Sequence, residues 1–176
     1  MSILYLLGVC QKLNTEQLKM YLKKMVGNDD DFMERNFEDI FRFQNFDREI
    51  IDFCVKNKYG SNDFFKLPNI NDDDRIKYIN NGGFIDYIIQ SNFVSEKVIS
   101  FILNSFEKMM KDWRDWGTLE YYFEIMNDYF SEYNHYKKYN PEGYKFEYKN
   151  LEKRFEKIKE KYVRLNDERN FIKPII

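Results

Sequence analysis

Two adjacent glycines interrupt a chain whose apolar residues otherwise recur at helical spacing. They lie in the segment Asn80-Asn81-Gly82-Gly83-Phe84. Because glycine lacks a Cβ atom, it accepts a positive φ angle, so a helix can end here and the chain can turn sharply. Apolar residues resume at Phe84 and Ile88. The segment therefore predicts a turn between two helices, and its structural residues are Asn81, Gly82, Gly83 and Phe84.

Helical patterns extend over most of the chain. Asn14 and Gln17 have the spacing of a capping box, and Asp47, Ser95 and Thr118 precede further apolar runs. The clearest pattern is the last one, where apolar residues recur at steps of four and three at Leu151, Phe155, Ile158, Tyr162 and Leu165. We predict an all-α fold, a single compact multi-helix domain over residues 1–176. Residues 3–13 also fit one short N-terminal strand, because periodicity cannot distinguish the two over so few residues.

Two segments have the composition of connections. Ser61–Ile70 contains Pro68 and predicts a loop, and Tyr133–Tyr148 contains Pro141 and Gly143 among tyrosines and lysines. Aromatic rings beside lysines can stack on single-stranded nucleic acid. The same composition also fits a solvated loop padded by aromatic side chains, which is the interpretation we favour.

The charge balance restricts the class of partner. The chain has 28 basic and 30 acidic residues, a net charge of −2, which argues against a general nucleic-acid binder. Residues 28–86 hold 14 acidic and 8 basic residues, a net −6, whereas residues 144–173 hold 10 basic and 6 acidic, a net +4. No apolar run reaches the roughly 20 residues that a membrane helix needs. We therefore expect a cytoplasmic protein with no membrane partner.

The sequence offers little catalytic chemistry. His135 is the single histidine and lies in a polar segment, without a nucleophile or orienting partner at recognisable spacing. Cys10 and Cys54 each lie in apolar surroundings, as buried reduced thiols do, and they do not form a metal-binding motif. No phosphate loop or dinucleotide fingerprint is present. We expect a protein that is not an enzyme and that uses neither a cofactor nor a metal.

Two acidic triplets and a tryptophan pair are candidates for binding a partner. The triplets Asp29-Asp30-Asp31 and Asp72-Asp73-Asp74 suit the positive ends of helix dipoles, and they also suit a patch that binds a basic surface. Consecutive helical residues point about 100° apart, so neither triplet converges on one metal ion. Trp113 and Trp116 flank an arginine, as interface anchors often do, although the same pair can close a core.

The segment Arg75–Tyr87, which contains the Asn-Gly-Gly-Phe turn, resembles the DNA-mimic-protein family of small helical bacterial domains. Residues Leu151–Phe155 and Tyr162–Asn166 are similar to that family's closing helix, so the resemblance spans about residues 60–168. The chain departs from the family pattern at Tyr78-Ile79, where an acidic residue is usual, and at Asp86, where a glutamine is usual. The resemblance implies surface carboxylates that imitate DNA phosphates and occupy a DNA-binding protein.

We therefore expect a non-enzymatic module that binds and blocks a basic protein through an acidic, aromatic surface. Such a protein would be a DNA mimic, an immunity protein or an inhibitor of a defence nuclease, from a bacterium or a phage. The predicted partner-binding residues are Asp29, Asp30, Asp31, Glu34, Glu38, Asp39, Asp72, Asp73, Asp74, Trp113 and Trp116. Association into a homodimer remains open.

The alternative is a nucleic-acid-binding protein that uses its basic C-terminal helix. The cations of that helix are Lys153, Arg154, Lys157, Lys161 and Arg164. Glutamates interleave with them at positions 152, 156 and 160, and this argues against the alternative.

Overall fold

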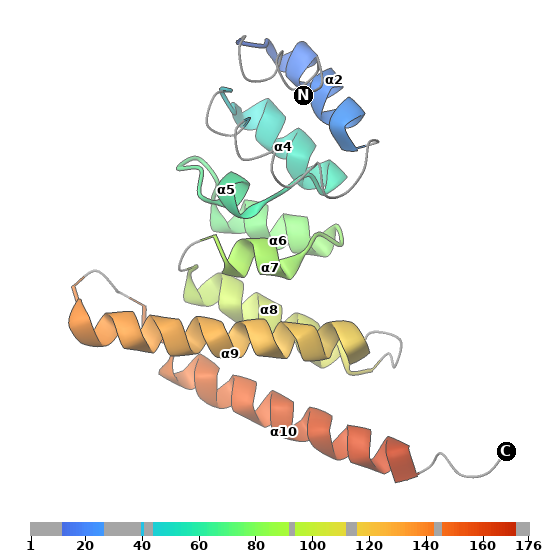
Figure 1. Cartoon of the computed structure of the whole chain (residues 1–176), viewed down its shortest axis with the longest axis vertical. Coiled ribbons are helices and arrows are strands. Elements are labelled where there is room, and N and C mark those ends of the chain that lie inside the picture. The colour runs from blue at the N-terminus through green and yellow to red at the C-terminus, as the bar shows by residue number, and fades with distance from the viewer. Residues whose placement is uncertain are drawn as a thin grey trace, which may run out of the picture. The chain divides into compact units, whose positions relative to one another are not determined.

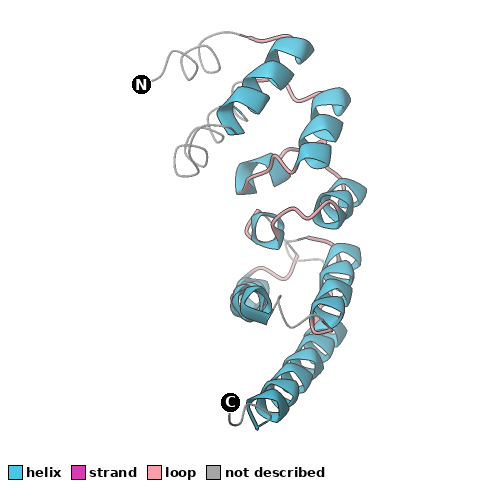
Figure 2. Cartoon of the chain, turned by 90° about the vertical axis from the view of Figure 1, so that its right-hand side faces the viewer, coloured by secondary structure: helices cyan, strands magenta, loops and turns pink. Residues whose placement is uncertain are grey.

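The computed structural model describes residues 12–26, 40, 44–91, 94–111, 116–142 and 146–171, with side chains at all of these except 25, 26, 116 and 169–171. Within these ranges every regular element is a helix and no strand occurs, which confirms the all-α class (Figure 2). The segment expected to be a strand or helix at residues 3–13 lies almost entirely outside them.

The chain divides into two compact units, Met1–Phe93 and Val94–Ile176. The helices are labelled in Figure 1. The first unit contains α2 (Thr15–Val26), α4 (Arg48–Asn57), α5 (Asn62–Phe65), α6 (Asp72–Asn80) and α7 (Ile85–Ile89); the second contains α8 (Glu96–Met109), α9 (Trp116–Tyr139) and α10 (Lys149–Phe171). A single domain over residues 1–176 stays a prediction.

Polar side chains cap three helices where the sequence indicated, but Thr118 lies inside α9, which begins at Trp116, so the cap predicted there is wrong. Asn14 accepts a hydrogen bond from the Gln17 backbone N–H at 2.9 Å, and Gln17 Oε1 accepts one from the Asn14 N–H at 3.1 Å, which completes the capping box of α2. Asp47 and Ser95 cap α4 and α8 in the same way. These bonds satisfy backbone N–H groups that would otherwise lack a partner at a helix start.

Large aromatic side chains build the core of the first unit. Phe64, Phe65 and Tyr78 are fully buried. The ring of Phe65 meets the ring of Tyr78 edge-on at a centroid distance of 4.8 Å. The buried face of α4 completes this core with Ile50, Ile51, Cys54 and Val55. The predicted loop at 61–70 thus contains α5, because Ser61 caps a short helix that buries two phenylalanines.

The core of the second unit forms where α8 packs against both α9 and α10. Phe123 of α9 lies between three rings, at 5.6 Å from Phe106 of α8 and at 5.8 Å and 5.2 Å from Phe155 and Tyr162 of α10. Such edge-on pairs add to the free energy gained from burial alone. None of the described helices is long and apolar enough to cross a membrane.

Candidate functional site

Most of the predicted partner-binding residues of the acidic middle segment lie outside the described part of the chain. These are Asp29, Asp30, Asp31, Glu34, Glu38 and Asp39, together with Trp113. Trp116 is the first residue of α9, and its side chain is not among those described. The triplet at 72–74 and the glycine turn are the predicted sites that can be built from their contacts.

Asp74 has an internal role. It is 2% exposed and accepts a hydrogen bond from Arg48 Nη1 at 2.9 Å, and its second oxygen contacts Nη2 of the same arginine. It also completes a capping box with Asn71, whose backbone N–H it receives at 3.0 Å. Burial opposes ionisation, but the bonds from Arg48 and Asn71 outweigh it and hold the pKa of Asp74 below its ordinary value. Asp74 therefore joins α4 to α6.

The other two members of the triplet lie closer to solvent. Asp72 forms an ion pair with Arg75 at 3.7 Å, and its side chain is 34% exposed. Asp73 is exposed at the start of α6. Both carboxylates lie in the first turn, where the helix dipole favours negative charge. Within the triplet, Asp73 and part of Asp72 are thus accessible to solvent, whereas Asp74 is not.

The Asn-Gly-Gly-Phe turn has a packing role. Gly82 has a φ of 81°, and its N–H and that of Gly83 bond to the carbonyls of Ile79 and Tyr78 at 2.9 Å and 3.0 Å, which ends α6. Asn81 donates from Nδ2 to the carbonyl of Val55 at 3.0 Å and so ties the turn to α4. Phe84, by contrast, is 58% exposed. Helix-end geometry therefore accounts for three of the four predicted turn residues.

The exposed side of α9 carries a series of carboxylates that the sequence analysis did not single out. Glu120, Glu124, Asp128 and Glu132 follow one another at steps of four residues, and all four are exposed. Residues four apart on a helix are neighbours on its surface. At a rise of about 1.5 Å per residue, the carboxylates stand about 6 Å apart along the axis. They form a continuous acidic ridge.

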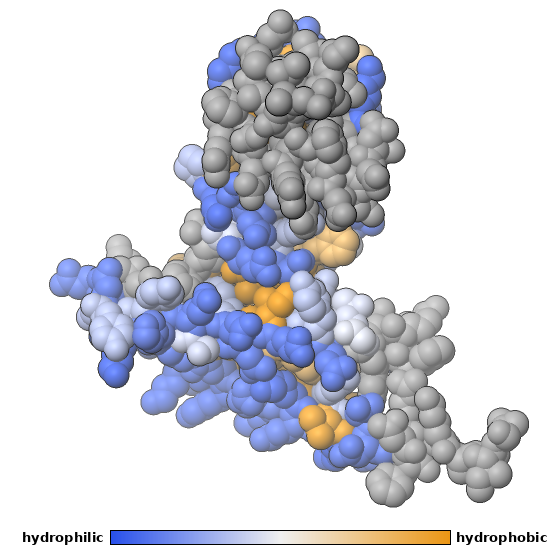
Figure 3. Space-filling view, viewed as in Figure 1, coloured by the Kyte–Doolittle hydropathy of each residue, from blue (hydrophilic) through white to orange (hydrophobic). Residues whose placement is uncertain are grey.

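Exposed tyrosines lie at both ends of this ridge. Tyr121 is 48% exposed near the start of α9, and Tyr136 and Tyr139 are 50% and 71% exposed near its end. The ring of His135 contacts the rings of Tyr136 and Tyr139 at centroid distances of 5.5 Å and 5.1 Å. We call the four carboxylates and these three tyrosines the α9 outer face. In the second unit, hydrophilic side chains cover most of the side visible in Figure 3.

The acidic ridge lacks a compensating cation. Residues 116–136 contain no lysine or arginine. Among the described residues, none of the four carboxylates forms an ion pair, whereas carboxylates elsewhere, such as Glu107 with Arg154 at 3.0 Å, do. Like charges at a spacing of four residues destabilise a helix by about 0.2–0.5 kcal/mol per pair. Folding therefore does not explain why this face is uniformly acidic.

His135 and Cys54 are the described side chains that nucleophilic or general-base chemistry would use most readily. His135 is exposed, and its ring contacts the rings of Tyr136 and Tyr139. No group of three or more His, Cys, Asp or Glu side chains that could hold a metal ion occurs among these residues. Cys54 is buried in the core, and burial raises the pKa of its thiol far above the ordinary value. A thiol with so high a pKa is not a nucleophile.

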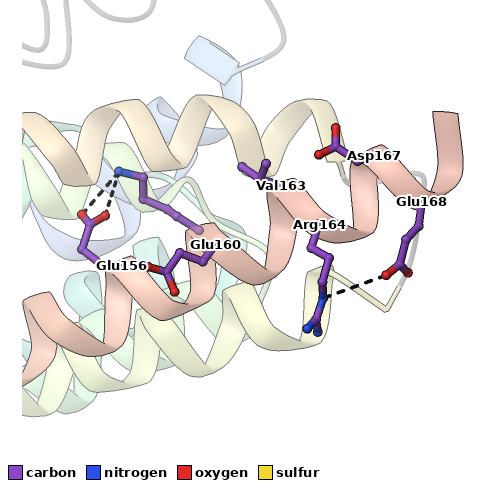
Figure 4. Close-up of a pocket in the computed structure, with 7 residues that line it drawn as sticks. Glu156, Glu160, Val163, Arg164, Asp167 and Glu168 are labelled. Atoms are coloured by element: carbon purple, nitrogen blue, oxygen red, sulfur yellow. Dashed lines mark hydrogen bonds and ion pairs between the residues drawn. The ribbon is translucent and has the colours of Figure 1, made fainter. Parts of the chain in front are cut away.

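A shallow groove of about 600 Å³ runs along the C-terminal half of α10 (Figure 4). Its described lining residues are Glu156, Lys159, Glu160, Val163, Arg164, Asp167 and Glu168. Lys159 pairs with Glu156 at 3.3 Å, and Arg164 lies 4.0 Å from Glu168. Because the groove is open to solvent, it is not an enclosed cavity of the kind that small-molecule sites usually form.

No protein-family model, curated protein or solved structure matches this chain. The structure alone shows that the described part of this small protein is all-helical, and the likeness to DNA-mimic proteins stays a proposal.

The α9 outer face could have been found from the sequence. Its signal is the step of four between acidic residues from Glu120 to Glu132, within a stretch that lacks lysine and arginine. The apolar residues of this helix identify only its buried side, and the charges on the opposite side form a separate pattern. Runs of consecutive acidic residues are more conspicuous in a sequence than carboxylates separated by one helical turn.

Proposed function

We propose that this chain is a non-enzymatic protein-interaction module that binds a basic protein partner through the α9 outer face. The observation that carries the proposal is the ridge of carboxylates at a regular spacing of four residues between exposed tyrosines, for which no ion pair exists among the described residues. Carboxylates without internal partners stay available for a cationic surface. Exposed tyrosines supply the large, rigid contact area that protein interfaces favour.

Complementary charge would give this interface its speed and its salt dependence. An acidic ridge raises the association rate of a basic partner. Salt weakens this attraction, because charges more than about 10 Å apart are largely screened at about 0.1 M ionic strength. The tyrosines would hold the complex after encounter, because aromatic side chains dominate binding hot spots. Asp72, Asp73 and the acidic segment at 29–39 are further candidates for contact with the same or a second partner.

The class of partner follows from the regularity of the ridge. Carboxylates about 6 Å apart along one helix present repeated negative charge, as a nucleic-acid backbone does. We propose that the partner is a protein whose basic face normally contacts nucleic acid, and that this chain blocks it in the cytoplasm. An immunity protein or an inhibitor of a defence nuclease would act in this way. The resemblance of residues 75–87 to DNA-mimic proteins supports the same proposal.

The test begins with capture of partners from a lysate of the cells that encode the protein, at low and at high salt. The retained protein is then purified and its affinity measured by calorimetry. The variant Glu124→Gln/Asp128→Asn/Glu132→Gln should bind at least tenfold more weakly, and Tyr136→Ala/Tyr139→Ala should dissociate faster. A matched variant, Glu49→Gln/Glu142→Gln/Asp167→Asn, removes the same charge from other exposed positions and should bind like the wild type.

Two results would count against this proposal. Unchanged affinity of the α9 variant would exclude the α9 outer face as the binding surface. A loss in the matched variant alone would transfer the site away from α9 to the positions altered there.

A further inference from the structure

A second charged surface lies on α10 and has the opposite sign. Lys153, Lys157, Lys161 and Arg164 are all exposed and follow one another at steps of four, four and three residues. This spacing places them on one side of the helix. The buried side is formed by Phe155, Ile158 and Tyr162, which are at most 8% exposed. We call these four cations the α10 basic ridge.

Among the described residues, the cations of this ridge make few polar contacts within the protein. In the described part of the chain, Lys153, Lys157 and Lys161 form neither an ion pair nor a side-chain hydrogen bond, and Arg164 only approaches Glu168 at 4.0 Å. The neighbouring Arg154 differs, because it bonds to Asn104 at 2.5 Å and to Glu107 at 3.0 Å on α8. The structure therefore separates one structural cation from four that face solvent.

Two of the three glutamates that interleave with these cations in the sequence bond to residues outside the ridge. Glu152 receives a hydrogen bond from Asn134 of α9 at 2.5 Å, and Glu156 pairs with Lys159, which also bonds to Asn127 of α9 at 2.9 Å. In Figure 4 Arg164 extends away from Val163 and Asp167, which lie on the other side of α10. Glu160 is exposed and lies three residues after Lys157 and four before Arg164, so it lies beside the ridge, where the four cations outnumber it.

We propose that the α10 basic ridge binds the phosphate backbone of a nucleic acid. Repeated ammonium and guanidinium groups about 5–6 Å apart along the helix suit a repeated anion, because each can form a charge-assisted hydrogen bond with one phosphate. No aromatic or apolar side chain belongs to the ridge itself, whereas a protein interface of comparable strength usually has such an anchor. Phosphate contacts need only the cations, so this chemistry favours nucleic acid over an acidic protein.

Binding of this kind would be weak and indifferent to base sequence, since the ridge offers nothing to read the base edges. Up to four phosphate contacts predict a slope of about −3 to −4 for the logarithm of the association constant against the logarithm of salt concentration. The affinity should then fall about a hundredfold between about 50 mM and about 200 mM NaCl. This activity is separate from the proposed function, since it uses another helix and a partner of opposite charge.

The experiment uses fluorescence anisotropy with the full chain and two labelled probes of equal length, a DNA duplex and a single strand. The variant Lys153→Ala/Lys157→Ala/Lys161→Ala/Arg164→Ala should lose at least tenfold in affinity and most of the salt slope. The matched variant Lys56→Ala/Lys77→Ala/Lys108→Ala/Lys111→Ala removes four exposed lysines elsewhere and should retain the slope. Circular dichroism confirms that both variants fold.

Three results would overturn the inference. These are no salt-dependent binding by the wild type, equal binding by the ridge variant and the wild type, and displacement of the DNA by polyglutamate at an equal concentration of charge. The last would identify an acidic protein as the occupant. The α9 variant Glu124→Gln/Asp128→Asn/Glu132→Gln should bind DNA at least as well as the wild type, so failure of either proposal can be recognised separately.

Discussion

The ring of Tyr78 fills the space beside Gly83 that a side chain would need. A Cβ atom added to Gly83 would overlap the ring atoms Cδ1, Cε1 and Cζ of Tyr78. Gly60 borders the same ring, because a Cβ atom added to Gly60 would lie 2.9 Å from Cζ and 2.9 Å from the hydroxyl oxygen of Tyr78. The Tyr78 hydroxyl donates to the carbonyl of Lys58 at 3.3 Å. Two glycines therefore make room for one fully buried tyrosine.

We expect Gly83→Ala to lower the free energy of unfolding by about 1–3 kcal/mol, which is the usual cost of forcing extra atoms into a packed core. The ring cannot easily move away, because Phe65 packs against it at 4.8 Å. Urea denaturation followed by circular dichroism measures this loss. Gly117→Ala is the control: nothing lies within 4 Å of its added Cβ, and alanine in α9 should stabilise by about 0.5–1 kcal/mol. Equal stability of the two variants would contradict the packing argument.

The sequence predicted the role of one of the two glycines at this turn. The end of a helix at Gly82 was predictable, because the need for a positive φ is a local property of the chain. The role of Gly83 was not, since it depends on contact with the Tyr78 ring and on Gly60, which is distant in the sequence. In the same way, the capping position of Asp74 is local, but its ion pair with Arg48 required the packing of α4 on α6.

The pair formed by Arg48 and Asp74 predicts a dependence of stability on pH. Because the pKa of Asp74 is lowered in the folded state, its contribution is fully present above the unfolded value of about 4 and is lost as the pH falls through the folded value. Arg48→Met leaves the buried carboxylate without its main partner. It should cost about 1–3 kcal/mol at neutral pH.

Urea denaturation at a series of pH values checks this prediction. The difference in unfolding free energy between wild type and Arg48→Met should narrow as the pH falls below about 4, since protonation removes the charge that Arg48 stabilises. Arg164→Met is the control, because that arginine is 70% exposed and should change stability by less than about 0.5 kcal/mol. A difference that stays constant with pH would mean that Arg48 acts through packing alone.

A pair of buried tyrosines holds the first residue of the second unit. The Val94 N–H donates to Tyr129 Oη at 3.1 Å, the Tyr148 hydroxyl donates to the Val94 carbonyl, and the two hydroxyl oxygens lie 2.9 Å apart. Tyr148→Phe would leave the Val94 carbonyl unsatisfied and should cost about 1–3 kcal/mol. Tyr139→Phe, at a side chain that is 71% exposed, should change stability by less than about 0.5 kcal/mol. Urea denaturation measures both losses in unfolding free energy, and equal losses would mean that the buried hydrogen bond contributes nothing beyond the removal of a hydroxyl group.

The same tyrosines predict a loss of stability in alkali. Burial raises the pKa of Tyr129 to about 12 and raises that of Tyr148 above its ordinary value. Their contribution is fully present below the unfolded pKa of about 10 and is lost as the pH rises toward the folded values, because the unfolded chain releases these protons first. Stability measured by urea denaturation should fall between about pH 10 and pH 12. A flat profile there would show that the two hydroxyls are hydrated.

The extent of α9 shows where local patterns were misjudged. Tyr133–Tyr148 was predicted to be a connection, but α9 continues to Tyr139, so that prediction was wrong for residues 133–139. Tyr133 lies four residues after Tyr129 and extends the buried side of the helix, with its hydroxyl donating to the carbonyl of Phe146 at 2.6 Å. The helical spacing was present, but the polar residues between the tyrosines obscured it. Tyr148 is buried against the ring of Tyr133, and no local pattern in the sequence indicated this contact.

Neutralising the acidic ridge should make the protein more stable. Glu120→Gln/Glu124→Gln/Asp128→Asn/Glu132→Gln removes three repulsive pairs at a spacing of four residues, each worth about 0.2–0.5 kcal/mol, so the unfolding free energy should rise by about 0.5–1.5 kcal/mol at low salt. The gain should shrink in high salt, which already screens the repulsion. Glu107→Gln, which weakens a bond to Arg154, should instead lower stability. If the ridge is a binding surface that costs folding free energy, the stabilised variant should also lose its partner. If the ridge only keeps the protein soluble, stability should rise and binding should be unchanged.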